Sequence, residues 1–89
     1  MATLLNMAKE ARKKIKKAER LQADAVFLYI HDKPVGYLKS SINEAREATI
    51  EATTATQMVL SQLEKDSPKR RLYQSVIQKN NVFLDATQG

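Results

Sequence analysis

The sequence predicts a mainly α, α+β fold of three helices and one β-hairpin, and three observations support this fold class. Two glycines and two prolines in 89 residues leave a composition that favours helix. Apolar residues recur at helical spacing over about residues 3–23, 42–65 and 68–84. Residues 25–39 instead have the composition of two short strands around a turn. The length fits one small domain, 1–89, with a core so thin that oligomerisation would help to stabilise it.

The first predicted helix, residues 3–23, is amphipathic and starts at Thr3, a residue type that commonly caps helix N-termini. One side carries an apolar stripe formed by Leu4, Met7, Ala8, Ala11, Ile15, Ala18 and Leu21. The other side carries six cations, which are Lys9, Arg12, Lys13, Lys16, Lys17 and Arg20. Because the apolar stripe would pack into a core, we expect the six cations to face water.

Residues 25–39 allow two interpretations. Residues 26–30 are β-branched or aromatic at every position except Leu28, and residues 31–34 have turn chemistry, so a hairpin is preferred. The alternative extends the first helix to about residue 31 and gives an all-α bundle with two long antiparallel helices.

A two-stranded hairpin is marginal in water unless it packs on something else. If the hairpin forms, it must lie on the helices or pair with a second copy of the chain. We therefore expect Phe27, Leu28 or Tyr29 at a buried or intersubunit position.

The second predicted helix, residues 42–65, begins with a capping box and carries an alanine seam. Ser41 and Glu44 match the S-x-x-E pattern, in which the serine hydroxyl accepts from the glutamate N–H. This start favours the hairpin, because it leaves residues 36–39 extended. One face of the helix holds Ile42, Ala45, Ala48, Ala52, Ala55, Val59 and Leu63. Small side chains allow a close helix neighbour, so Ala48, Ala52 and Ala55 are predicted interface residues.

The third predicted helix, residues 68–84, follows Ser67 as N-cap and Pro68 as first helical residue. Its apolar face consists of Leu72, Tyr73, Val76 and Ile77. A second cation cluster, Lys69, Arg70 and Arg71, lies at its start. Cations there oppose the helix dipole, which is a mild indication that they are used for binding.

Charge is unevenly distributed and indicates an anionic partner. The net charge is +5, and residues 1–30 alone hold seven Lys or Arg against three Asp or Glu. Phosphate backbones release counterions to such a surface, so we expect a non-enzymatic regulatory protein that contacts nucleic-acid phosphates with little base readout. The predicted nucleic-acid-binding residues are Lys9, Arg12, Lys13, Lys16, Lys17, Arg20, Lys69, Arg70 and Arg71.

Protein–protein interaction is the alternative function, as an assembly factor, chaperone or inhibitor of a larger machine. The candidate interface consists of Phe27, Leu28, Tyr29, Ala48, Ala52 and Ala55. In either case a homo-oligomer is expected. The glutamates Glu44, Glu47 and Glu51 form an acidic stripe that either faces solvent or pairs with the basic helix of another subunit.

The residue types present argue against several chemistries. Without cysteine the chain forms no disulfide or thiolate metal site, and its one histidine, His31, lacks the partners of a catalytic triad. The acidic stripe has no further ligand nearby, so neither a metal nor a cofactor is predicted. The longest apolar run, residues 25–30, is too short for a membrane span, and a cytoplasmic (intracellular) location is expected.

Overall fold

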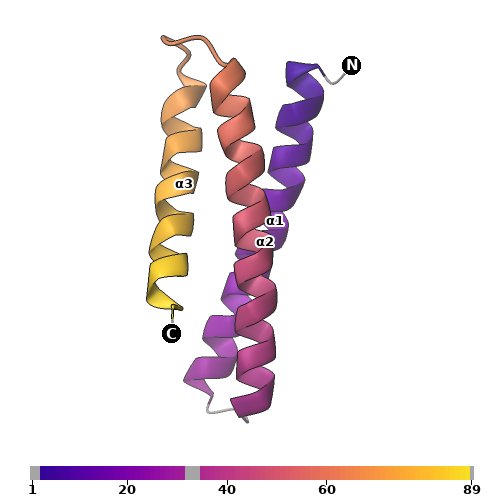
Figure 1. The fold of residues 1–89 in the computed structure, drawn as a ribbon, viewed down its shortest axis with the longest axis vertical. Coiled ribbons are helices and arrows are strands. Elements are labelled where there is room, and N and C mark those ends of the chain that lie inside the picture. The colour runs from indigo at the N-terminus through magenta and orange to yellow at the C-terminus, as the bar shows by residue number, and fades with distance from the viewer. Residues whose placement is uncertain (1–2, 32–34, 89) are drawn as a thin grey trace.

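The computed structural model describes residues 3–31 and 35–88, which form three helices (Figure 1). These helices are α1 (Leu4–Ile30), α2 (Val35–Gln62) and α3 (Lys69–Ala86). α2 lies between the other two and runs antiparallel to both, and α1 packs against it more extensively than α3 does. The helical class and the alternative with two long antiparallel helices are therefore confirmed.

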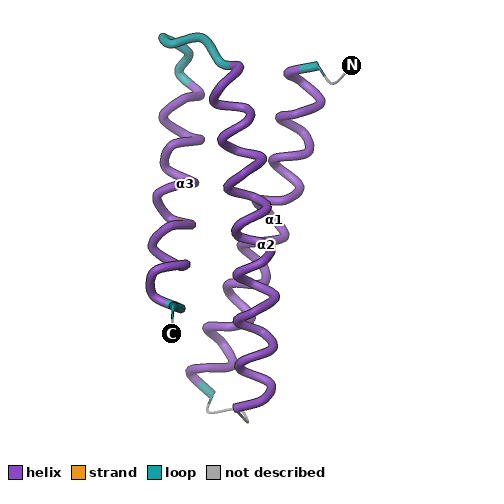
Figure 2. Tube along the Cα trace, in the orientation of Figure 1, coloured by secondary structure: helices purple, strands orange, loops and turns teal. Residues whose placement is uncertain are grey.

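The predicted β-hairpin at residues 25–39 is wrong. No strand occurs in the described ranges (Figure 2), because residues 25–30 continue α1 and residues 35–39 begin α2. Residues 32–34 of the expected turn lie outside the described residues. The capping box is also wrong as a helix start, because Ser41 lies inside α2.

A seven-residue alanine repeat explains why helix prevails over strand in this segment. Ala11, Ala18 and Ala25 are all buried, and a seven-residue spacing keeps them in one seam along α1. Extending α1 past residue 23 adds Ala25 to this seam and half-buries Leu28. Packing against α2 thereby outweighs the local strand preference of residues 26–30.

Small side chains form the core between α1 and α2. The buried apolar residues contributed by α2 are Ala45, Ala48, Ala52 and Val59, each at most 5% exposed. Thr49 and Thr56 are also fully buried, and their hydroxyls donate to the carbonyls of Ala45 and Ala52 one turn earlier. Because alanine and threonine add little bulk, the two helix backbones can approach closely along their length.

Polar contacts join α3 to α2. Arg46 on α2 donates to the Leu84 carbonyl near the end of α3, at 2.7 Å. Arg70 at the start of α3 donates to the Leu60 carbonyl near the end of α2, at 3.1 Å. Each helix thus supplies a cation to the C-terminus of the other, where the helix dipole is negative. These contacts determine how far α3 extends along α2.

The helix starts agree partly with the sequence. Thr3 is confirmed as an N-cap, since its hydroxyl accepts from the N–H of Asn6 at 3.2 Å. The third helix begins at Lys69, one residue later than predicted, so the prediction of Ser67 as N-cap and Pro68 as first helical residue is wrong: Pro68 is the capping residue. Ser67 contributes a long hydrogen bond, accepting at its hydroxyl from the Lys69 N–H at 3.4 Å.

Candidate nucleic-acid interface

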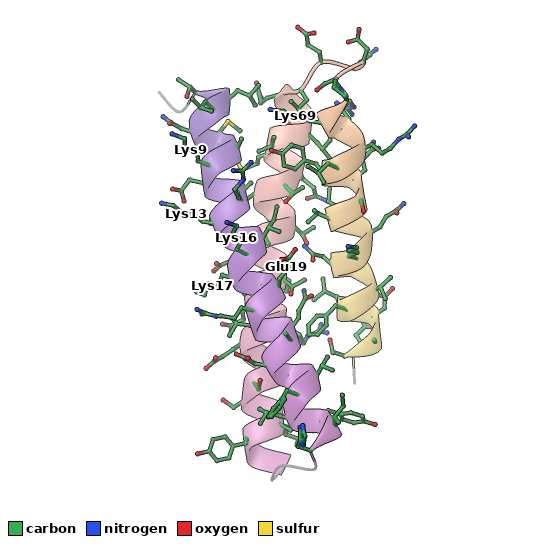
Figure 3. All side chains as sticks on the ribbon, turned by 180° about the vertical axis from the view of Figure 1, so that it is seen from behind. Lys9, Lys13, Lys16, Lys17, Glu19 and Lys69 are labelled. Atoms are coloured by element: carbon green, nitrogen blue, oxygen red, sulfur yellow. The ribbon has the colours of Figure 1, made fainter. Side chains whose placement is uncertain are left out.

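The six predicted cations of the first helix form one exposed surface on α1, here named the cationic face. Successive residues of an α-helix are rotated by about 100° around its axis, so the six side chains fall within an arc of about 140°, opposite the buried alanine seam. Figure 3 shows four of its lysines along the upper part of α1. The full set is Lys9, Arg12, Lys13, Lys16, Lys17 and Arg20, all exposed. The expectation that these cations face water is confirmed. The apolar stripe faces inward in part: Ala11 and Ala18 are buried, whereas Leu4 is 40% exposed.

The cationic face is scarcely neutralised by carboxylates of its own chain. Within the described ranges a single ion pair falls inside 4.0 Å, between Lys13 Nζ and Glu10 Oε1 at 3.9 Å. Both side chains are exposed, so the pair contributes little and leaves Lys13 able to contact a ligand. Lys17 lines a shallow hollow together with the acidic stripe Glu44, Glu47 and Glu51. None of these three carboxylates forms an ion pair with Lys17 within 4.0 Å. The cationic face is therefore available to an external anion.

The second cation cluster is divided by the fold. Lys69 and Arg71 are exposed at the end of the molecule where α1 begins, and Figure 3 shows Lys69 at the start of α3. Arg70 is half-buried, and its guanidinium donates to the carbonyls of Leu60 and Leu63 at 3.1 and 3.3 Å. Arg70 thus caps α2, and we leave it out of the proposed interface.

The predicted protein-interaction residues separate into two groups. Ala48 and Ala52 are buried and Ala55 is half-buried, so in this structure the alanine seam packs within the chain. Phe27 and Tyr29 remain 57% and 71% exposed. Burial of the seam therefore removes one candidate surface, and exposure of the aromatic residues leaves the other available.

The exposed aromatic residues belong to a group of apolar side chains at the end where α1 and α2 form a helical hairpin, here named the hairpin end. It consists of Val26, Phe27, Tyr29, Ile30 and Tyr37, each at least half exposed. Phe27 and Tyr37 line one hollow there, and Val26 and Tyr29 line another. α3 reaches only one side of this surface, where Val26 and Tyr29 line a hollow together with Phe83 and Ala86. The contacts of Arg46 place the last turn of α3 more than two turns above the start of α2, so the rest of the hairpin end is uncovered. Tyr37 is not among the predicted interface residues, because the sequence places it in a strand of the expected hairpin.

A groove between α1 and α3 is a further feature that the sequence analysis did not identify. Its upper part is a hollow of about 320 Å³ lined by residues that include Arg12, Ile15, Lys16, Glu19, Leu72 and Val76. A second hollow of about 330 Å³ lies further along the same two helices, where Val26 and Tyr29 meet Phe83 and Ala86. Leu72, Val76, Phe83 and Ala86 recur at coiled-coil spacing, a sequence signal that could have revealed this wall.

Residues 3–31 and 35–88 hold no group of three or more His, Cys, Asp or Glu side chains placed to bind a metal ion. In these ranges no helix has both the length and the hydropathy needed to cross a bilayer. Comparison of the chain with known protein families, curated proteins and solved structures finds no match.

Proposed function

We propose that this chain is a small, non-enzymatic regulatory protein that binds double-stranded nucleic acid through the cationic face of α1. One observation supports the proposal above the others. Six exposed cations share one side of a single helix, and in the described ranges Lys13 alone among them has a carboxylate within 4.0 Å. Uncompensated cations on a rigid element attract a polyanion without first having to break internal ion pairs.

The dimensions of the cationic face suit a phosphate backbone. Lys9 and Arg20 are eleven residues apart, which is about 16 Å along a helix axis. A duplex carries one negative charge per ~1.7 Å of its axis, so several phosphates come within reach of the six side chains. No aromatic residue occurs between Lys9 and Arg20, so base stacking is not expected to contribute. Binding is accordingly electrostatic and nearly independent of base sequence.

The test is titration of a fluorescein-labelled 20-base-pair DNA duplex, followed by fluorescence anisotropy at increasing salt. If all six cations contact phosphates, the logarithm of the binding constant should fall with the logarithm of salt concentration with a slope of about −5. The variant Lys13→Glu/Lys16→Glu/Lys17→Glu should lose this binding while keeping the wild-type circular dichroism spectrum, because all three side chains are exposed.

A matched control variant shows whether binding depends on the cationic face or only on the net charge of the protein. Lys39→Glu/Lys65→Glu/Lys79→Glu makes the same change in net charge at exposed lysines outside the cationic face. We expect this variant to retain most of the wild-type affinity. Equal losses in the two triple variants, or no binding by the wild type at low salt, would reject the cationic face as the interface.

A second function, protein–protein interaction, is favoured by the hairpin end. Five apolar side chains gather there, and isolated monomers seldom leave such a surface uncovered. We propose that an apolar surface of a partner protein covers it. Phe27→Ser/Tyr37→Ser should abolish recovery of a specific partner in pull-downs, whereas Val82→Ser on α3 should not. Recovery of the same partner by all three proteins would exclude the hairpin end.

A further inference from the structure

The molecule has two complementary surfaces on opposite sides. α1 and α3 pack on one half of α2, and the exposed other half is here named the ridge. Its apolar residues Ile50 and Met58 are 50% and 54% exposed, and the acidic residues Glu47 and Glu51 flank them. On the side of the ridge next to α1, Glu47, Glu51 and Met58 also line shallow hollows shared with α1. At 100° per residue, the ridge lies roughly opposite the groove between α1 and α3.

The groove differs from the ridge in the sign of its charge and, like the ridge, exposes apolar side chains. Its walls carry Ile15 on α1 and Leu72 and Val76 on α3, with Leu72 still 63% exposed. The lining contains two cations, Arg12 and Lys16, against one anion, Glu19. Apolar residues at coiled-coil spacing along the α3 wall suit a helix better than an extended segment. The groove is therefore shaped and charged for a helix with apolar and acidic sides.

We propose that the groove of one copy receives the ridge of a second copy, so that the chains assemble head to tail. In a copy stacked in the same orientation, α2 would enter the groove antiparallel to α1 and α3 and complete a four-helix bundle. Such a contact joins two different surfaces, so it continues from copy to copy and produces a ring or a filament.

The charges of the two surfaces, and the positions of their residues along the long axis of the molecule, support a second copy as the occupant of the groove. Gln22 Nε2 on α1 donates to Thr49 Oγ1 on α2 at 2.8 Å, so these residues lie at one height. A second copy stacked without an axial shift would place its Glu51 level with Arg20 and next to Glu19, whereas a shift of about one helical turn toward the start of α1 would place Glu51 level with Lys16 and Ile50 close to Ile15. Opposite charges would then meet around an apolar centre, which favours this register over others.

Charge reversal provides the sharpest test, carried out without nucleic acid because Arg12 and Lys16 also belong to the cationic face. Sedimentation velocity of the wild type at low salt should show species larger than a monomer. Arg12→Glu/Lys16→Glu and Glu47→Lys/Glu51→Lys should each be monomeric, because each places like charges on ridge and groove. An equimolar mixture of the two variants should assemble again, since each then presents the charge that the other lacks.

Control variants show whether a loss of assembly is specific to the ridge and the groove. Glu64→Lys/Asp85→Lys makes the same charge change as Glu47→Lys/Glu51→Lys, but at exposed sites outside both surfaces. This control variant should assemble like the wild type. Leu72→Asp in the groove should prevent assembly, and Val82→Asp, at a similarly exposed position of α3, should not. Circular dichroism confirms that each variant is folded. A monomeric wild type, assembly that survives both charge reversals, or a mixture that stays monomeric overturns the proposal.

Discussion

Nη1 of Arg46 on α2 lies 2.7 Å from the carbonyl oxygen of Leu84 in the last turn of α3, and donates a hydrogen bond to it. The same nitrogen donates to the hydroxyl of Thr87, the residue that ends α3. Arg70 makes the reciprocal contact, with carbonyls near the end of α2. Two arginines thus hold α2 and α3 antiparallel at a definite height.

Replacing Arg46 with methionine should lower the free energy of unfolding by about 1–2 kcal/mol, because a half-buried, charge-assisted hydrogen bond to a helix C-terminus is lost. Urea denaturation followed by circular dichroism measures the change. Arg71→Met removes an exposed guanidinium from α3 and should cost less than about 0.5 kcal/mol. Equal costs would show that the capping contact does not stabilise the fold.

Asn80 provides a second polar contact between α3 and α2. Its side chain is 6% exposed, and Nδ2 donates to Thr53 Oγ1 at 3.0 Å. Asn80→Ala should therefore cost about 1 kcal/mol, and a double-mutant cycle with Thr53→Ala should give a coupling energy of about 0.5–1 kcal/mol. Strictly additive costs in denaturant titrations would contradict a direct interaction between these two residues.

Ala52 tests the close approach of α1 and α2. The residue is 0% exposed and lies in the alanine seam, so Ala52→Leu should destabilise the protein by about 1–3 kcal/mol through overpacking. Ala23→Leu adds the same atoms at an exposed position of α1 and should change stability by less than about 0.5 kcal/mol. Thermal melts of the two variants should differ accordingly, and similar melting temperatures would argue against a tight seam.

Gly36 tests the helical start of α2. A Cβ added at this glycine would meet no atom within 4 Å, so alanine fits without a clash. Gly36→Ala should raise the free energy of unfolding by about 0.5–1 kcal/mol, because alanine has the higher helix propensity. A fall in the urea midpoint would be incompatible with residues 35–39 forming the first turn of a helix.

Local patterns in the sequence predicted the inward side of the first two helices, but not of the third, where Leu72 is exposed and Asn80 is buried. The periodicity around Ala11 and Ala18 indicated the buried side of α1 and hence the exposed cationic face. Capping chemistry correctly identified Thr3 and placed the third helix within about two residues at each end. These features depend on neighbouring residues and are therefore readable without tertiary structure.

Contacts between distant segments explain what could not be predicted. Residues 26–30 prefer strand locally, and only packing of the seam through Ala25 against α2 makes them helical. The sequence predicts Arg70 as a free cation, because its acceptors on α2 become its neighbours only when the chain folds back. The groove depends on the angle between α1 and α3, which no local pattern specifies.

The sequence by itself determined the helical class, the inward and outward sides of α1, and the concentration of positive charge on its exposed side. The tertiary structure alone decided that residues 25–30 and 35–39 are helical, that the alanine seam is used within the chain, and that a groove opens opposite the ridge. The physical reason is that side-chain periodicity sets which surface of a helix is buried, whereas the partner of that surface depends on contacts between residues far apart in the chain.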